Sequence, residues 1–223
     1  MDTLPANARR DFTPAAPFLS IYDVVIAVGT REARWRGALL RQLAAQPGDV
    51  IADLGCGTGS FLALLGRQVP GSTLIGVDPD AAILQRAERK LRQAGVPAAL
   101  QMGYLRDAQA LLAAQGVHKI VSSLVFHQVP MAEKRAGLAA ILAALPPGGE
   151  LHVADYGLQR GWLMRWLFKW VQLVDGFADT QPNAEGILPV LMAEVGFRHV
   201  QETNVIPTVG GSISIYRAVK PLA

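Results

Sequence analysis

The chain alternates between two hydrophobic rhythms from residue 49 to residue 157. Short, mainly apolar runs bounded by glycine, proline or aspartate are typical of buried strands, whereas apolar residues that recur every three or four positions are typical of helices. Strands that alternate with helical crossovers form a parallel sheet with helices on both faces. We expect strands at 50–54, 73–77, 98–102, 119–126 and 150–155, and helices at 58–68, 81–93, 106–114 and 131–145.

The flanking segments extend this pattern at both ends. A helix is predicted at 31–45, with Trp35 and Leu39 on its apolar side. Two further helices are predicted at 158–174 and 184–195, and two late strands at 198–205 and 212–219. We expect the last strand to run antiparallel, as the hairpin partner of the strand before it. The chain of 223 residues is therefore expected to form one α/β domain.

Composition narrows the class of protein. With 51% hydrophobic and 17% charged residues, the chain is expected to build a full core. The net charge of +3 is scattered along the chain, so no nucleic-acid partner is expected. Cys56 is the single cysteine, which excludes an internal disulfide and a cysteine-cluster metal site. The polar N-terminal stretch lacks an apolar signal core and no apolar run is long enough to span a membrane, so we expect a cytoplasmic protein.

The strongest chemical signal is a glycine-rich turn after the first expected strand. Gly55, Gly57 and Gly59 stand at alternate positions, and glycine is needed where backbone takes a positive φ or lies against a ligand. Ser60 stands where NAD-binding proteins have their third glycine, and no Gly-Lys-Ser/Thr follows. Turns of this kind are where open α/β sheets bind nucleotide-like ligands.

Two aspartates accompany the turn. Asp53 lies in the first strand shortly before Gly55, and Asp78 follows the second strand. Adjacent parallel strands bring these two strand ends side by side. A carboxylate at the second strand end can accept both hydroxyls of a ribose whose adenosine lies across the turn. The two acids therefore predict an adenosine-containing ligand.

Five motifs then occur in the order of one enzyme family: DLGCGTG at 53–59, GVD at 76–78, SSLVFH at 122–127, PGG at 147–149 and AEVGF at 193–197. With them the chain resembles the class I S-adenosylmethionine-dependent methyltransferases, in the subgroup of quinone-biosynthesis-like and other small-molecule enzymes. The resemblance implies a Rossmann-like, doubly wound α/β sheet of seven strands, mostly parallel with an antiparallel last strand. It implies S-adenosyl-L-methionine as cofactor and S-adenosyl-L-homocysteine as product. The implied segments are an N-terminal helical cap (1–48), a cofactor-binding core (49–157), a helical substrate lid (158–196) and a C-terminal strand pair (197–223).

The resemblance also assigns cofactor contacts. Asp53 is expected to organise the amino group, Asp78 to accept the ribose hydroxyls, and Asp107 to meet the adenine amino group. Tyr22 and Arg36 are expected at the methionine part, with ordinary packing and surface solvation as the alternative for both. The remaining expected contacts are Gly55, Cys56, Gly57, Thr58 and Gly59 in the turn, Pro79 and Ile83 beside the adenine, and Ser122 and Ser123 at the end of the fourth strand.

Methyl transfer needs little catalytic machinery, because the cofactor is already activated and the protein mainly aligns the nucleophile. In this fold the ends of the fourth and fifth strands face the methyl group. His127 is the candidate general base, since an unshifted imidazole titrates near neutrality; the alternative is a polar contact to cofactor or backbone. Asp155 is expected to accept a hydrogen bond from the substrate or from a residue that contacts it, and Tyr156, next to it, is the third candidate catalytic residue. No metal constellation is evident.

The segment 161–174 has an unusual pattern, with tryptophans at helical spacing and a narrow polar stripe. Trp162, Trp166 and Trp170 share one side, and Arg165 and Lys169 belong to the stripe. The family has its substrate lid here, which predicts a hydrophobic small-molecule acceptor. A core or dimer helix is a second reading, so the chain is expected to be a monomer or homodimer. A less favoured third reading is contact with a membrane surface.

These patterns predict an S-adenosylmethionine-dependent transfer of methyl to an oxygen, carbon or nitrogen atom of a hydrophobic small molecule. The fourth strand is not followed by the Asn/Asp-Pro-Pro-aromatic motif that methylation of nucleobase or protein amide nitrogen favours. Two alternatives remain open. One is a lipid-headgroup methyltransferase at a membrane surface, and the other is a cofactor-binding protein without turnover.

Overall fold

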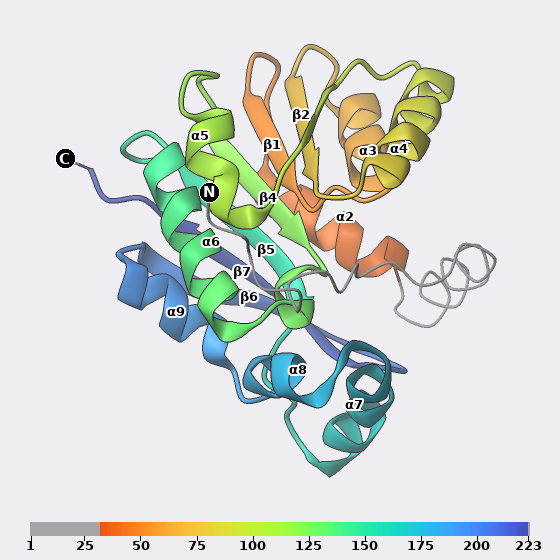
Figure 1. Cartoon of the computed structure of the whole chain (residues 1–223), viewed down its shortest axis with the longest axis vertical. Helices are drawn as coiled ribbons and strands as arrows, with labels where there is room; N and C mark the ends of the chain where they lie inside the picture. The colour runs from red at the N-terminus through yellow and green to blue at the C-terminus, as the bar shows by residue number, and fades with distance from the viewer. Residues whose placement is uncertain (1–31, 223) are drawn as a thin grey trace, which may run out of the picture.

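The computed structural model describes residues 32–222, and the description below is of that part of the chain. Seven strands form one sheet in the order β3-β2-β1-β4-β5-β7-β6 (Figure 1). The strands are β1 (Val50–Leu54), β2 (Thr73–Asp78), β3 (Ala99–Met102), β4 (Lys119–Ser123), β5 (Glu150–Tyr156), β6 (Arg198–Thr208) and β7 (Gly211–Val219). The α-helices are α2 (Glu32–Leu43), α3 (Ser60–Gln68), α4 (Ala81–Ala94), α5 (Ala108–Leu112), α6 (Met131–Ala144), α7 (Trp162–Asp175), α8 (Phe177–Ala184) and α9 (Ile187–Val195). Two short 3₁₀ helices are η2 (Leu105–Asp107) and η3 (Phe126–Gln128).

The sheet has the predicted parallel core and antiparallel last strand. Strands β1 to β5 pair in parallel, and β7 runs antiparallel to both β5 and β6. The order reverses between β1 and β4, where chain crossovers diverge to opposite sides. Ligands of open α/β sheets bind outside the carboxyl ends of the strands at such a switch point. The predicted Rossmann-like, doubly wound fold is confirmed.

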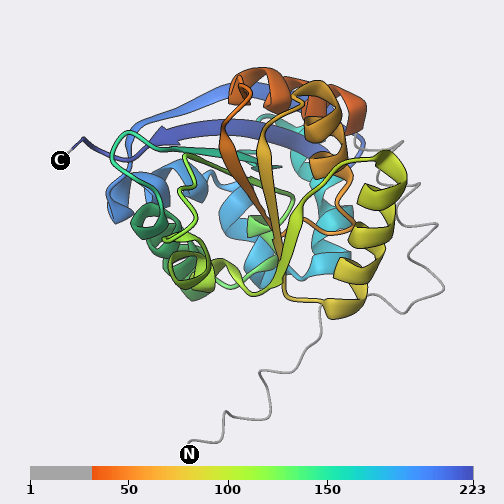
Figure 2. The same cartoon turned by 90° about the horizontal axis from the view of Figure 1, so that it is seen from above.

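Helices cover both faces of the sheet (Figure 2). On one face, α5, α6 and α9 bury residues such as Leu138 and Leu191 against the strands. On the other face, α2, α3 and α4 bury residues such as Trp35 and Phe61. Both patterns follow from the helical spacing of apolar residues, because a stripe along one side of a helix can be removed from water only by packing on a neighbour.

Several predicted elements differ from the structure at their ends. The helix predicted at 158–174 begins at Trp162, and the one predicted at 106–114 is η2 followed by the shorter α5. The fourth strand ends at Ser123 and not at residue 126, because Leu124 takes a positive φ of 56° and the chain turns into η3. The helix predicted at 184–195 begins only at Ile187, since Gly186 adopts a left-handed conformation with φ 85°. The residues before it belong to α8, a helix that the sequence pattern did not indicate.

The segment expected as a lid divides into two parts. Helix α9 packs against α6 and β6 and belongs to the helical layer of the sheet. Helices α7 and α8 contact each other and lie together at the lower end of the molecule in Figure 1. Helix α8 also contacts η3, and α7 contacts β7. The α7–α8 pair is therefore the part of this segment that stands outside the two layers.

Candidate active site

The glycine-rich turn follows β1, and all three of its glycines have a positive φ: 74° at Gly55, 53° at Gly57 and 72° at Gly59. A Cβ atom at Gly55 would lie 2.3 Å from a methyl carbon of Val125, so the loop after β4 packs directly on the turn. A Cβ atom at Gly57 would meet no heavy atom within 4 Å among the described residues. The turn thus presents bare backbone to open space at Gly57, as close approach of a ligand requires.

Asp78, in the last position of β2, holds the turn in place. Its two carboxylate oxygens accept hydrogen bonds of 3.0 Å from the backbone N–H groups of Gly57 and Asp80, one to each oxygen. The side chain is buried, and this burial raises the pKa of Asp78, although the two backbone N–H groups counteract the effect. Each carboxylate oxygen can accept a second hydrogen bond. Asp78 therefore has capacity for two ligand hydroxyls.

Asp53 is a buried carboxyl group that lacks a hydrogen-bond partner. It is 1% exposed, and neither carboxylate oxygen is hydrogen-bonded by any residue in the range 32–222. Burial raises the pKa of Asp53 to about 7, against the opposing positive charge of Arg36 on α2. Arg36 itself pairs with Glu32. A buried polar group without a partner is costly, so Asp53 is suited to receive a donor from a ligand, above all a cationic one.

Cys56 and Thr58 have their own partners within the turn region. The Cys56 thiol is buried, and burial raises its pKa, so it is not a reactive thiolate. The Thr58 hydroxyl accepts a hydrogen bond of 2.8 Å from Lys90 Nζ of α4. Lys90 Nζ also donates to the Ser60 hydroxyl at 2.6 Å. The contact fixes the start of α3 against α4, and it was not predicted from the sequence.

The predicted adenine side lies at the ends of β2 and β3. Gly103 N–H donates to the Asp78 carbonyl at 3.2 Å, which brings the two strand ends together. The Asp107 carboxylate accepts a hydrogen bond of 2.9 Å from the Tyr104 N–H and so caps η2. Pro79 is exposed and Ile83 is half-buried on the first turn of α4. Asp107 thus lies at the expected edge of the sheet with one oxygen already engaged.

The two serines at the end of β4 differ in their surroundings. Ser122 is fully buried and donates a hydrogen bond of 2.8 Å to the Leu54 carbonyl, so its hydroxyl joins β4 to β1. Ser123 is half-buried at the last position of the strand. Tyr22, predicted at the methionine part, lies outside the described residues.

His127 on η3 lies between two acids. Its Nδ1 is 2.7 Å from Asp155 Oδ1, and its Nε2 is 3.4 Å from Asp175 Oδ2 at the end of α7. Burial lowers the pKa of His127, but the charges and hydrogen bonds of Asp155 and Asp175 raise it further, to about 9. The ring is 2% exposed and is protonated at neutral pH. A protonated imidazole cannot accept a proton, so this geometry does not favour the general-base role.

Asp155, in β5, organises the loop after β4. One oxygen accepts hydrogen bonds from the N–H groups of Val125 at 3.0 Å and Phe126 at 2.7 Å. The other oxygen accepts from the Tyr156 N–H at 2.7 Å and faces His127. With all of these partners and no exposed surface, Asp155 acts as a structural anchor for η3.

Lys134 on α6 fastens the same loop from the other side. Its buried ammonium donates to the carbonyls of Phe126 at 2.5 Å and Asp179 at 2.9 Å, and also to the carbonyl of Val129. Burial lowers the pKa of Lys134 to about 8. Since Asp179 belongs to α8, this single side chain joins η3 to the α7–α8 pair.

Tyr156 is a buried aromatic residue at the carboxyl end of β5. Its ring meets that of His127 edge-on at 5.0 Å between centroids and that of Phe168, on α7, at 5.1 Å. Edge-on and tilted contacts of this kind are favourable arrangements for aromatic pairs. The predicted residues His127, Asp155 and Tyr156 are thus brought together, and Phe168 joins them from the lid segment.

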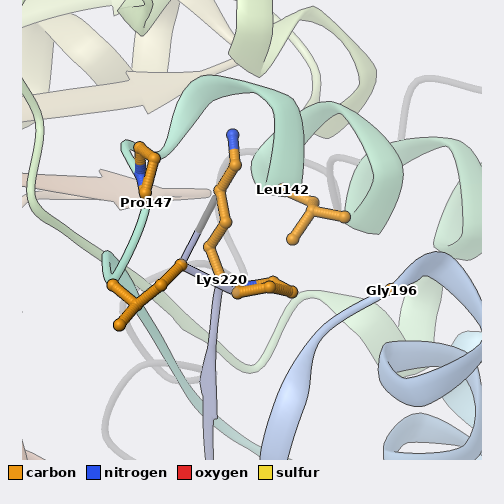
Figure 3. Close-up of a pocket in the computed structure, with 6 residues that line it drawn as sticks. Leu142, Pro147, Gly196 and Lys220 are labelled. Atoms are coloured by element: carbon orange, nitrogen blue, oxygen red, sulfur yellow. The ribbon is translucent and has the colours of Figure 1, made fainter.

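A separate hollow of about 300 Å³ lies elsewhere (Figure 3). It is lined by Leu142 at the end of α6, Pro147 before β5, Gly196 after α9, and Lys220 after β7. Lys220 Nζ donates to the carbonyl of Leu145 at 2.6 Å. Because Pro147 precedes β5 while Asp155 and Tyr156 end it, this hollow lies at the opposite end of the strand from the glycine turn.

Some contributors had no recognisable sequence signal. Asp175 ends α7 and Lys134 lies in the first turn of α6, positions where a charged side chain is normally solvent-exposed, and only the tertiary structure brings them to His127 and η3. Asp175 ends a helix far along the chain from His127, so no local spacing rule could pair them.

Among residues 32–222, no group of three or more metal-binding side chains is clustered, and no helix in that range is long and apolar enough to cross a bilayer.

The chain is similar in sequence to known methyltransferases. Residues 51–149 match the family model described as a methyltransferase domain. The ubiquinone/menaquinone biosynthesis C-methyltransferase of Shewanella halifaxensis is 24% identical over 98% of this chain and 94% of its own. The demethylmenaquinone methyltransferase of Lactobacillus johnsonii is 33% identical over 41% of this chain and 37% of its own.

A solved structure agrees in fold. The magnesium protoporphyrin IX methyltransferase of Synechocystis, determined with bound S-adenosylhomocysteine, has a TM-score of 0.71 and covers 97% of this chain and 100% of its own, at 16% identity. The seven-stranded sheet agrees with this likeness in fold. Residues 51–149 are therefore a methyltransferase domain, and the chain is an S-adenosylmethionine-dependent methyltransferase with S-adenosylmethionine as its cofactor.

Proposed function

We propose that this enzyme transfers the methyl group of S-adenosylmethionine to an apolar ring compound of the quinol class. The observation that carries the proposal is the likeness, over nearly the whole chain, to ubiquinone/menaquinone biosynthesis C-methyltransferases.

The cofactor supplies a methyl group on a positively charged sulfur, and the residues of the first two strand ends fit its other parts. Asp53, buried and without a partner among residues 32–222, would receive the amino group of the cofactor. Arg36, whose positive charge acts on Asp53, would pair with the carboxylate of the cofactor. Asp78 would accept the ribose hydroxyls through the acceptor capacity that its two backbone hydrogen bonds leave. Gly57 would lie directly against the ligand.

We propose that His127 positions the acceptor side of the site. Its ring is clamped by Asp155 and Asp175, and it supports the ring of Tyr156 edge-on. Since Asp175 belongs to α7, the clamp connects the loop after β4 with the helix expected to cover the acceptor. Alignment of the acceptor and exclusion of water are the main tasks of the protein in this reaction.

The experiment compares three acceptors under identical conditions with the full chain and S-adenosylmethionine. They are a hydroquinone with a short isoprenoid tail, a tail-free polar catechol, and a phospholipid with an amine headgroup in vesicles. The readouts are the rate of S-adenosylhomocysteine formation and the mass of the product. We expect the tailed hydroquinone to give the highest kcat/KM and a product heavier by one CH₂ unit. Preference for the phospholipid or the polar catechol would contradict the proposal.

A further inference from the structure

The outward side of helix α7 is an apolar surface on which none of residues 32–222 packs closely. Trp162 is 78% exposed, Trp166 53% and Trp170 62%. Leu173 at 76% and Phe177 at 61%, just beyond the helix, continue the surface. The inward side already anchors the helix, through Phe168. Monomeric proteins rarely expose a contiguous apolar surface of this kind unless it binds something.

The charges on this helix are asymmetric. Arg165 and Lys169 are its only basic residues, and both are exposed. Neither takes part in an ion pair within the described part of the chain. Asp175, the only acid of the helix, turns inward to His127. The exposed surface of α7 therefore carries positive charge alone.

The positions of these residues on the helix fit one geometry. At about 100° per residue, the three tryptophans fall on one side, and Arg165 and Lys169 fall together along one border of that side. Tryptophan prefers the boundary between hydrocarbon and water, since one part of its ring system is apolar and its N–H is polar. Basic side chains at the border of such a face reach lipid phosphates while their stems stay on apolar surface.

We infer that the outward side of α7, from Trp162 to Phe177, docks on the surface of an anionic lipid bilayer. The helix would lie in the plane of the interface, with the tryptophans among the acyl chain ends and with Arg165 and Lys169 at the phosphates. The charge complementarity favours this partner over a second copy of the chain, whose own α7 would bring like charges together. The inference does not depend on the identity of the methyl acceptor.

The test measures binding of the full chain to vesicles, with no turnover involved. Sedimentation with phosphatidylcholine vesicles is compared with sedimentation on vesicles containing phosphatidylglycerol, at low and high salt. Brominated lipids report insertion, because they quench only tryptophans that enter the bilayer, and Trp35 is buried in the core at 1% exposure. We expect salt-sensitive binding to the anionic vesicles and quenching of the α7 tryptophans.

Two variants separate the α7 surface from general charge. Arg165→Glu with Lys169→Glu should weaken vesicle binding by about tenfold or more. Arg67→Glu with Arg198→Glu changes the net charge equally at exposed positions on α3 and β6 and should change binding by less than about twofold. Circular dichroism checks that each variant folds.

Several outcomes would overturn the inference. Equal loss in both double variants would mean that binding follows net charge and not the α7 surface. No binding to anionic vesicles, with a concentration-dependent dimer that shields the tryptophans, would indicate a second copy as the partner. No binding, with tryptophans already shielded from acrylamide in dilute protein, would indicate that residues 1–31 cover the surface.

Discussion

Replacing Asp78 by alanine tests the cofactor site most specifically. The carboxylate holds the N–H groups of Gly57 and Asp80 at 3.0 Å and retains one acceptor position on each oxygen. Hydrogen bonds to a charged group contribute about 1.5–3 kcal/mol each. Loss of two bonds to ribose hydroxyls therefore costs about 3–6 kcal/mol, which raises the Kd roughly 10²- to 10⁴-fold.

Isothermal titration of S-adenosylhomocysteine into wild type and Asp78→Ala measures this change. Asp80→Ala is the matched control, because Asp80 caps α4 by accepting from the N–H groups of Ala82 at 2.7 Å and Ile83 at 3.1 Å. The control should lose about 1 kcal/mol of stability and little affinity. If Asp78→Ala bound within about threefold of wild type, the assignment of the ribose to this carboxylate would be refuted.

Three further predictions concern the turn and the histidine clamp. As pH falls below about 7, the Asp53 carboxyl of the cofactor-free enzyme becomes protonated. Binding of the cofactor's cationic amino group must then expel that proton, so the affinity for the cofactor should fall by up to about tenfold per pH unit. Binding titrations from pH 5.5 to 7 measure this slope, which Asp53→Asn should remove. Because the pKa of His127 is raised to about 9, its charged form contributes stability that is complete below about pH 6.5 and is lost as pH rises through 9. Asp175→Asn should therefore lower the free energy of unfolding by roughly 1 kcal/mol at pH 6.5 and by less at pH 9.5, as measured by urea titration. Gly55→Ala should lower Tm more than Gly57→Ala, because only the Cβ atom at Gly55 meets a neighbour. Gly57→Ala should weaken S-adenosylhomocysteine binding with the smaller loss of Tm. The reverse order of Tm values would contradict the packing of the turn.

Most of the fold was predictable because each strand and helix carries its own hydrophobic period. The five apolar strand segments before residue 157 and the late hairpin all exist at nearly their predicted positions. The parallel orientation of the first five strands followed from the helical crossovers between them. Local pattern and global packing agree in these segments, so sequence was sufficient.

The end of β4 shows where local pattern fails. Val125 and Phe126 continue the apolar run, so the strand was expected to include them. Their N–H groups instead bond to the Asp155 carboxylate, and a buried acid on the neighbouring strand thus ends the ladder. Helix α8 was missed for a different reason, since its short polar sequence contains Pro182, which normally breaks a helix.

In the candidate site, too, some residues could be predicted from the sequence and others could not. The glycine turn and Asp78 were recognisable because a fixed spacing and a strand end suffice to define them. Asp175 and Lys134 could not be found, because their roles depend on where α6, α7 and α8 come to rest against η3. In the sequence such side chains look like ordinary surface charges near the ends of helices.

The most direct test of the account is to follow the methyl carbon itself. S-adenosylmethionine labelled in its methyl group is incubated with the full chain and a tailed hydroquinone, and the apolar product is extracted and examined by mass spectrometry. The account predicts that the label appears in the extract, bound to the acceptor, in step with S-adenosylhomocysteine formation. Tight binding of S-adenosylmethionine with no label in any apolar acceptor would contradict it and would favour a cofactor-binding protein without turnover.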